Sequence, residues 1–315
     1  MATAEIAEAL PANVTARGER RHKTAAWLLL SPTMIVLTLV GFWPLVYSLW
    51  ISLTGYRPTN PSVHQGWVGL DNYGTALASG QFWNAIWITV IFTGFSVVLS
   101  LLLGLGLAFL FNRRLPGFAV LRVIVLIPML ITPIAVGITW RVMFIPDSGV
   151  LNYLLRAVGL PDLHWTGSQG QALPSLILMD VWQWTPFMFL IIYAGLKALP
   201  ASPFEAARMD GATRWQIFWN VTLPLLRPVI LLAVLLRGID AVRTYDQIYM
   251  TTRGGPNFAT ETASIYIQRI NFRFFEVGYG AAVSWTFLIL LMAAVVLFIR
   301  YSGFLRDLRM REGEQ

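Results

Sequence analysis

The chain lacks cysteine and has few of the side chains that carry out chemistry in enzymes. Without cysteine it can form no disulfide, no thiolate metal site and no cysteine nucleophile. Its three histidines, His22, His64 and His164, all lie outside the long apolar runs. We therefore expect no metal site, and we disfavour an intramembrane enzyme because no clear pair of nucleophile and base is present.

Lysine is also scarce, occurring only at Lys23 and Lys197. Neither belongs to a Gly-x-x-x-x-Gly-Lys-[Ser/Thr] motif, so the chain has no phosphate-binding loop of that type. The formal net charge is +7, a balance that nucleic-acid-binding domains share. Here the basic residues gather at the ends of apolar segments rather than in one stripe, and we expect no nucleic-acid partner.

Charge as a whole is low, since charged residues make up 12% of the 315 residues and hydrophobic residues 56%. Soluble proteins carry about twice that charged fraction. A chain with so few ionic groups cannot cover its surface with them, so much of the surface must face lipid. The composition predicts an integral membrane protein.

Long apolar runs fit six membrane-spanning helices, because roughly twenty apolar residues cross a bilayer core. The expected spans are about 26–50, 83–111, 119–144, 172–196, 227–250 and 280–301. The first run is too long for a signal-peptide core and is expected to be uncleaved. A six-helix domain over 25–301 then lies between polar tails at 1–24 and 302–315. Prolines in the third and fourth runs, Pro128, Pro133 and Pro186, predict kinks.

The distribution of lysine and arginine sets the expected orientation. With the N-terminus in the cytoplasm, the inner segments hold fifteen basic residues and the outer loops five. This asymmetry predicts that both termini are cytoplasmic. The outer loops carry aromatic residues, which fit contact with an external partner or an aromatic belt at the membrane interface, and both interpretations stay open.

The same orientation places the longest polar, charge-bearing insert of the second half of the chain, 200–225, in the cytoplasm. Pro203 and Glu205 suit the first turn of a short helix. Gly211 permits a bend that a residue with a Cβ resists, and Pro224 is expected to end a second short helix. A charged pair of helices between two spans fits a docking surface for a partner in the aqueous phase.

The predicted fifth span contains four ionisable residues, which are costly inside a membrane. Arg237, Asp240, Arg243 and Asp246 are three residues apart, and on one helix they would lie on nearly one face, with Asp240 between two arginines. They could form intramembrane ion pairs (Arg237, Asp240 and Arg243) that fix packing or gate a path, or they could line a solute path. Asp240, Tyr245, Asp246 and Tyr249 are the lining candidates.

The fourth span offers Asp180, Trp182, Gln183 and Trp184 beside Pro186. Aromatic rings match the apolar face of a sugar, and carboxylate or amide groups match its hydroxyl rim. These four residues are therefore candidates for a solute path. The two tryptophans could equally be packing residues.

The insert resembles the "EAA" coupling loop of the permease subunits of ABC importers. The matching positions are Glu205, Ala206, Ala207, Asp210, Gly211, Ala212, Ile217, Leu223 and Pro224. The stretches 69–73, 126–146, 180–186 and 237–256 are similar to those of the carbohydrate branch, which includes maltose, glycerol-phosphate and trehalose importers. The resemblance implies an all-α integral membrane protein of the plasma (inner) membrane, with the type I importer permease fold and with the loop seated on a separate ATPase.

The resemblance also implies the partners of the chain: a second permease subunit, an ABC ATPase dimer that holds ATP and Mg²⁺, and an extracytoplasmic solute-binding protein. The chain itself then needs no cofactor and moves a sugar-like solute. The alternative is a stand-alone ion-coupled secondary transporter with Asp240 or Asp246 as cation site. Neutral sugars, disaccharides, polyols and anionic sugars all remain open as solutes.

Overall fold

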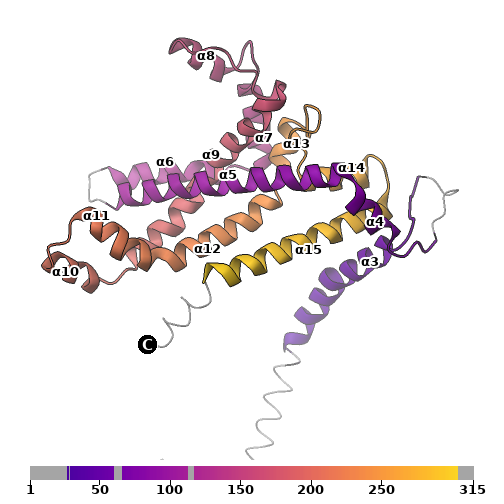
Figure 1. The fold of residues 1–315 in the computed structure, drawn as a ribbon, viewed down its shortest axis with the longest axis horizontal. Helices are drawn as coiled ribbons and strands as arrows, with labels where there is room; N and C mark the ends of the chain where they lie inside the picture. Colours follow the sequence, from indigo (N-terminus) through magenta and orange to yellow (C-terminus); the bar gives the residue numbers. More distant parts are fainter. Residues whose placement is uncertain (1–26, 28, 60–65, 113–116, 304–315) are drawn as a thin grey trace, which may run out of the picture.

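The computed structural model describes residues 27, 29–59, 66–112 and 117–303, and this part of the chain consists of helices and loops (Figure 1). Its one isolated β-bridge joins Thr54 and Trp67. The helices are η1 (Leu37–Phe42), α3 (Trp43–Ser52), α4 (Asp71–Ala78), α5 (Gly80–Phe111), α6 (Phe118–Leu130), α7 (Pro133–Met143), α8 (Val150–Ala157), η2 (Trp165–Gly167), α9 (Gln169–Lys197), α10 (Ser202–Met209), α11 (Arg214–Ile217), η3 (Phe218–Thr222), α12 (Leu223–Val242), α13 (Asp246–Thr251), α14 (Ala263–Phe272) and α15 (Val277–Ser302).

Four helices of the described residues are long and apolar enough to cross a membrane. They are Leu29–Ser52, α5, α9 and α15, and a fifth span results if the bent pair of α6 and α7 counts as one. α12, with its 20 residues, is not among them. Six spans are therefore not confirmed by length and composition, and most of the two predicted polar tails lies outside the described residues.

The expected third span is broken rather than kinked. Its two helices meet at 94°. α6 continues past Pro128 and ends at Leu130, and Thr132 takes an extended conformation before Pro133 opens α7. A residue before proline is driven out of the helical region by the proline ring, which accounts for the break at this point.

The predicted fifth span is wrong at its outer end, and so is the predicted helix end at Pro224. α11, η3 and α12 follow one another without a gap from residue 214 to 242, with Pro224 in the first turn of α12. The π-helical bonding of η3 lets the chain pass this proline without stopping. α12 ends at Val242, and α13 begins separately at Asp246.

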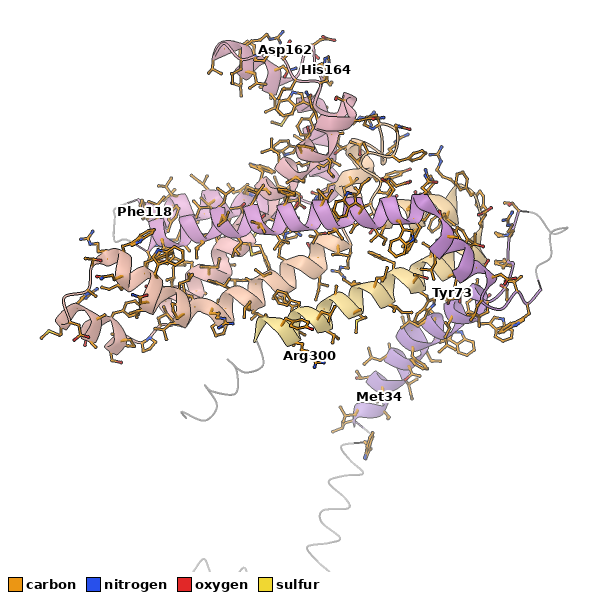
Figure 2. All side chains as sticks on the ribbon, in the orientation of Figure 1. Met34, Tyr73, Phe118, Asp162, His164 and Arg300 are labelled. Carbon is orange, nitrogen blue, oxygen red and sulfur yellow. The ribbon has the colours of Figure 1, made fainter. Side chains whose placement is uncertain are left out.

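One end of the bundle gathers the ends of four long helices, α5, α9, α12 and α15. Phe111, Leu196 and Leu226 share one apolar cluster, and Arg227 of α12 donates to the carbonyl of Ser302 at the end of α15. α10 and α11 extend from this same end, while α8 lies on an arm away from the bundle (Figure 1). Asp162 and His164 lie on that arm, and Arg300 lies near the end of α15 (Figure 2). α10 and α11 of the insert 200–225 contain no buried residue and therefore lie outside the packed core.

α5 and α9 pack closely against each other at Gly104. A Cβ at this position would lie 2.7 Å from the Cβ of Met188 and 2.8 Å from the backbone nitrogen of Phe189. Met188 and Phe189 are fully buried. Only a residue without a side chain fits, because the atoms in the way belong to the core of α9.

We predict that Gly104→Ala lowers the free energy of unfolding by about 1–3 kcal/mol, the usual cost of overpacking a core. Thermal unfolding of the purified chain in detergent measures it. The matched control is Gly106→Ala in the same helix, where an added Cβ meets nothing within 4 Å. Equal stability of the two variants would contradict this close approach.

Candidate functional site

The centre of the candidate site is a buried ion pair between two helices. Asp180 of α9 and Arg237 of α12 both have fully buried side chains, and the Arg237 guanidinium donates to the Asp180 carboxylate. The guanidinium also lies 5.2 Å from the centroid of the Trp184 ring. Two opposite charges without water contact attract strongly, and each would be costly to bury alone.

The second oxygen of Asp180 binds a residue that the sequence analysis did not single out. Gln247 of α13 donates its amide to Asp180 Oδ1 at 2.6 Å and is buried. α13 packs closely on α7, since a Cβ at Gly137 would lie 2.9 Å from the Gln247 carbonyl oxygen. A glutamine in an apolar run needs a buried partner, and that is the signal that could have identified it.

Asp240 lies between two arginines. Its carboxylate is 3.2 Å from Arg237 Nη1 and 3.6 Å from Arg243 Nη2. The prediction that four charges share one helix face is nevertheless wrong, because α12 ends before Arg243 and Asp246 begins the next helix. Arg237 is buried, whereas the side chain of Arg243 is 68% exposed. The charged side chains thus extend from the buried core at Arg237 to the solvent-exposed surface at Arg243.

A pocket of about 320 Å³ opens at the end of α12. Four of the predicted lining residues, Trp184, Asp240, Tyr245 and Asp246, line it, together with Arg243, Thr244, Gln247 and Pro133. Carboxylates, an amide, a hydroxyl and two aromatic rings in one pocket can bind a hydroxylated ligand. The buried pair of Asp180 and Arg237 lies behind this wall and holds Trp184 and Asp240 in place.

The remaining solute-path candidates, Trp182, Gln183 and Tyr249, do not line this pocket. Trp182 is 41% exposed and its ring lies against Trp140 of α7. Gln183 is buried and donates to the Ile131 carbonyl at 3.0 Å, at the break between α6 and α7. Tyr249 stacks on Tyr245 at 5.1 Å and does not line the pocket. Trp182 and Gln183 thus support neighbouring helices.

The insert 200–225 is a pair of short helices joined at a left-handed residue. Pro203 and Glu205 lie in the first turn of α10, and Gly211 has a φ of 73° with open space where a Cβ would lie. Thr213 and Gln216 form a reciprocal capping box at the start of α11. Glycine is favoured here by its backbone angle and not by lack of room.

The insert positions that match the coupling-loop pattern differ in their exposure to solvent. Ala206, Asp210 and Gly211 are exposed, whereas Ala207, Ala212, Ile217 and Leu223 are half-buried. Glu205 and Arg208 line a pocket of about 310 Å³ against the ends of α5 and α9. These exposed positions belong to α10 and the turn after it, which lie at one end of the molecule (Figure 1).

The loop between α13 and α14 is tied to α5 by a buried carboxylate. Glu261 pairs with Arg269 at 3.0 Å and accepts from Gln81 at 3.2 Å. Burial raises the pKa of Glu261, while Arg269 and Gln81 oppose that rise. The Arg269 guanidinium also lies 4.7 Å from the ring centroid of Phe258. These contacts order the loop between α13 and α14.

Comparison with known proteins assigns the chain to a family. Residues 100–311 match the family described as "Binding-protein-dependent transport system inner membrane component". The chain is 40% identical over 291 residues to the "Probable ABC transporter permease protein y4oQ" of Sinorhizobium fredii, covering 91% of this chain and 94% of that one. It is 36% identical over 298 residues to the "Trehalose/maltose transport system permease protein MalF" of Thermococcus litoralis, covering 94% and 99%.

A solved structure shares the fold. It is a chain of a bacterial alginate ABC transporter in complex with alginate pentasaccharide-bound periplasmic protein. The TM-score is 0.74 at 21% identity, and the match covers 90% of this chain and 96% of that one.

We predict that Asp180→Asn lowers the free energy of unfolding by about 3–5 kcal/mol, because Arg237 loses its fully buried counterion and keeps only the partly exposed Asp240. Asp246→Asn is the matched control, since Asp246 is exposed and surface changes stay within about ±0.5 kcal/mol. Thermal unfolding in detergent compares them. Replacing Asp180 and Arg237 together by leucine should recover stability, and a single variant as stable as the control would count against the pair.

Proposed function

The chain belongs to the family of binding-protein-dependent transport system inner membrane components, and from that membership we propose that it carries a sugar or sugar derivative as one permease subunit of an ATP-driven importer. It is a multi-pass inner-membrane protein of the ABC transporter permease class. The sugar assignment draws on a relative named for trehalose and maltose. The pocket beside Asp240, with its carboxylates and aromatic rings, fits such a solute.

The observation that carries the proposal is the continuous helical segment from residue 214 to 242. One end begins at the exposed insert, and the other end holds Arg237 and Asp240 at the pocket. We propose that 200–225 is the coupling loop, with its surface at Glu205, Ala206, Ala207, Asp210, Gly211 and Ala212 seated on an ATPase subunit. A displacement of the loop then moves the pocket wall through one helix.

The assembly proposed around this chain has three further parts. An ABC ATPase dimer supplies ATP and Mg²⁺, a second permease completes the solute path, and an extracytoplasmic solute-binding protein delivers the solute. The family description names the dependence on a binding protein. With α12 and the pair of α6 and α7 each counted as a span, the chain crosses the membrane six times with both termini and the coupling loop in the cytoplasm, in line with the excess of basic residues there.

We propose that the solute passes the pocket at the end of α12. Trp184 and Tyr245 offer ring faces, and Asp240, Asp246 and the Gln247 amide offer hydrogen-bonding groups. The buried Arg237 fixes Asp240 at 3.2 Å and need not touch the solute. The sequence left ion pairing and path lining as alternatives. In this proposal both occur in one site, with the buried ion pair behind the residues that line the path.

Gly211 tests the coupling role. Gly211→Val forces a β-branched residue into the left-handed region, and solute import by the reconstituted transporter should fall roughly 2–30-fold, the range in which coupling free energies respond to mutation. Gly211→Asn is the matched control, since asparagine tolerates this conformation. Glu205→Lys, on the same surface, should also reduce import while membrane insertion stays normal. Full import by both Gly211→Val and Glu205→Lys would refute the coupling role.

A stand-alone ion-coupled transporter is the competing function. It predicts solute uptake into vesicles that contain this chain alone, driven by an ion gradient and abolished by Asp240→Asn or Asp246→Asn. An importer subunit should give no uptake in such vesicles and full uptake once the ATPase, the second permease, the binding protein and ATP are added. Gradient-driven uptake by the isolated chain would replace the proposed function.

A further inference from the structure

Two cations from different helices converge on one aromatic ring at an end of the bundle. The guanidinium carbon of Arg122, on α6, lies 5.1 Å from the centroid of the Tyr193 ring. The ammonium nitrogen of Lys197, on α9, lies 5.4 Å from the same centroid. The Tyr193 ring is itself held by Phe189, with their centroids 5.5 Å apart. The arrangement therefore spans the junction of α6 and α9.

This cluster of Arg122, Tyr193 and Lys197 has an unbalanced charge. No carboxylate among the described residues pairs with either cation. Arg122 Nε is also buried without a hydrogen-bond partner. Like charges that share one ring repel each other, and the ring quadrupole offsets only part of that repulsion. An anion between them would complete the cluster.

The position of the cluster indicates what kind of anion fits. Lys197 is the last residue of α9, a helix long enough to cross the membrane, so the cluster lies at the level where a span meets the lipid headgroups. Along α6, directly after Arg122, the exposed side chains are apolar: Val123 at 63%, Ile124 at 53% and Ile127 at 49%. A ligand that fits this position has a phosphate beside the two cations and hydrocarbon chains beside the apolar side chains of α6. A phospholipid has both.

We propose that Arg122, Tyr193 and Lys197 form a binding site for an anionic phospholipid. Its phosphate lies between the two cations and its acyl chains lie along α6. Basic pockets between membrane helices bind acidic headgroups in this way. The site is separate from the pocket at the end of α12, and it does not depend on which solute the chain carries.

Native mass spectrometry of the purified full chain tests the site by titration with phosphatidylglycerol or phosphatidylcholine. Phosphatidylglycerol should bind more tightly. Arg122→Gln combined with Lys197→Gln should weaken its binding roughly 30-fold, since each cation near a membrane surface contributes about fivefold. Binding of phosphatidylcholine, whose trimethylammonium group balances the charge of its phosphate, should change less. Lys197→Gln alone changes an exposed residue and should cost about fivefold, so the test stands even if the double variant does not fold.

Arg300→Gln is the matched control. Arg300 is an exposed arginine in the last turn of α15, and within the described residues it contacts no aromatic ring. This variant should bind phosphatidylglycerol like the parent chain. Equal losses in Arg300→Gln and Lys197→Gln would overturn the site in favour of a diffuse charge effect. Displacement of phosphatidylglycerol by millimolar inorganic phosphate would overturn the lipid and leave a phosphate site.

Discussion

The buried guanidinium of Arg237 is the constraint on which the centre of this molecule depends. A charge with no water contact needs partners on several sides. Asp180 of α9 supplies one, Asp240 of its own helix a second, and the face of Trp184 a third. Asp180 in turn binds Gln247 of α13. One cation thus sets the positions of α9, α12 and α13, which together supply half of the residues that line the pocket.

Long apolar helices were predictable because length and hydropathy are local properties. The spans expected at 83–111, 172–196 and 280–301 correspond to α5, α9 and α15, which begin or end within three residues of them. The polar residues of the fourth and fifth apolar runs were also predicted to be functional, because polar groups are costly inside a membrane. Trp184, Asp240, Tyr245 and Asp246 do meet in one pocket, although no local pattern shows that they face one another.

Tertiary contacts decided what the sequence left undetermined. Asp180 and Arg237 are far apart in the chain, and only packing brings them together. The end of α12 at Val242 has no proline or glycine to mark it, so an unbroken helix to residue 250 was expected and is wrong. At the third span, by contrast, the sequence did contain a local signal, namely Pro133. Its effect on the preceding residue breaks the helix, which is a larger change than the expected kink.

The π-helical segment η3 has a consequence for the angular phase of α12. A π turn takes in one residue more than an α turn, and each residue of an α-helix advances the side chains by about 100°. Without that extra residue, everything after 222 would be rotated by that angle relative to α10 and α11. Arg237 would then turn away from Asp180. The orientation of the charged pocket is thus fixed at the opposite end of the helix, within the insert 200–225.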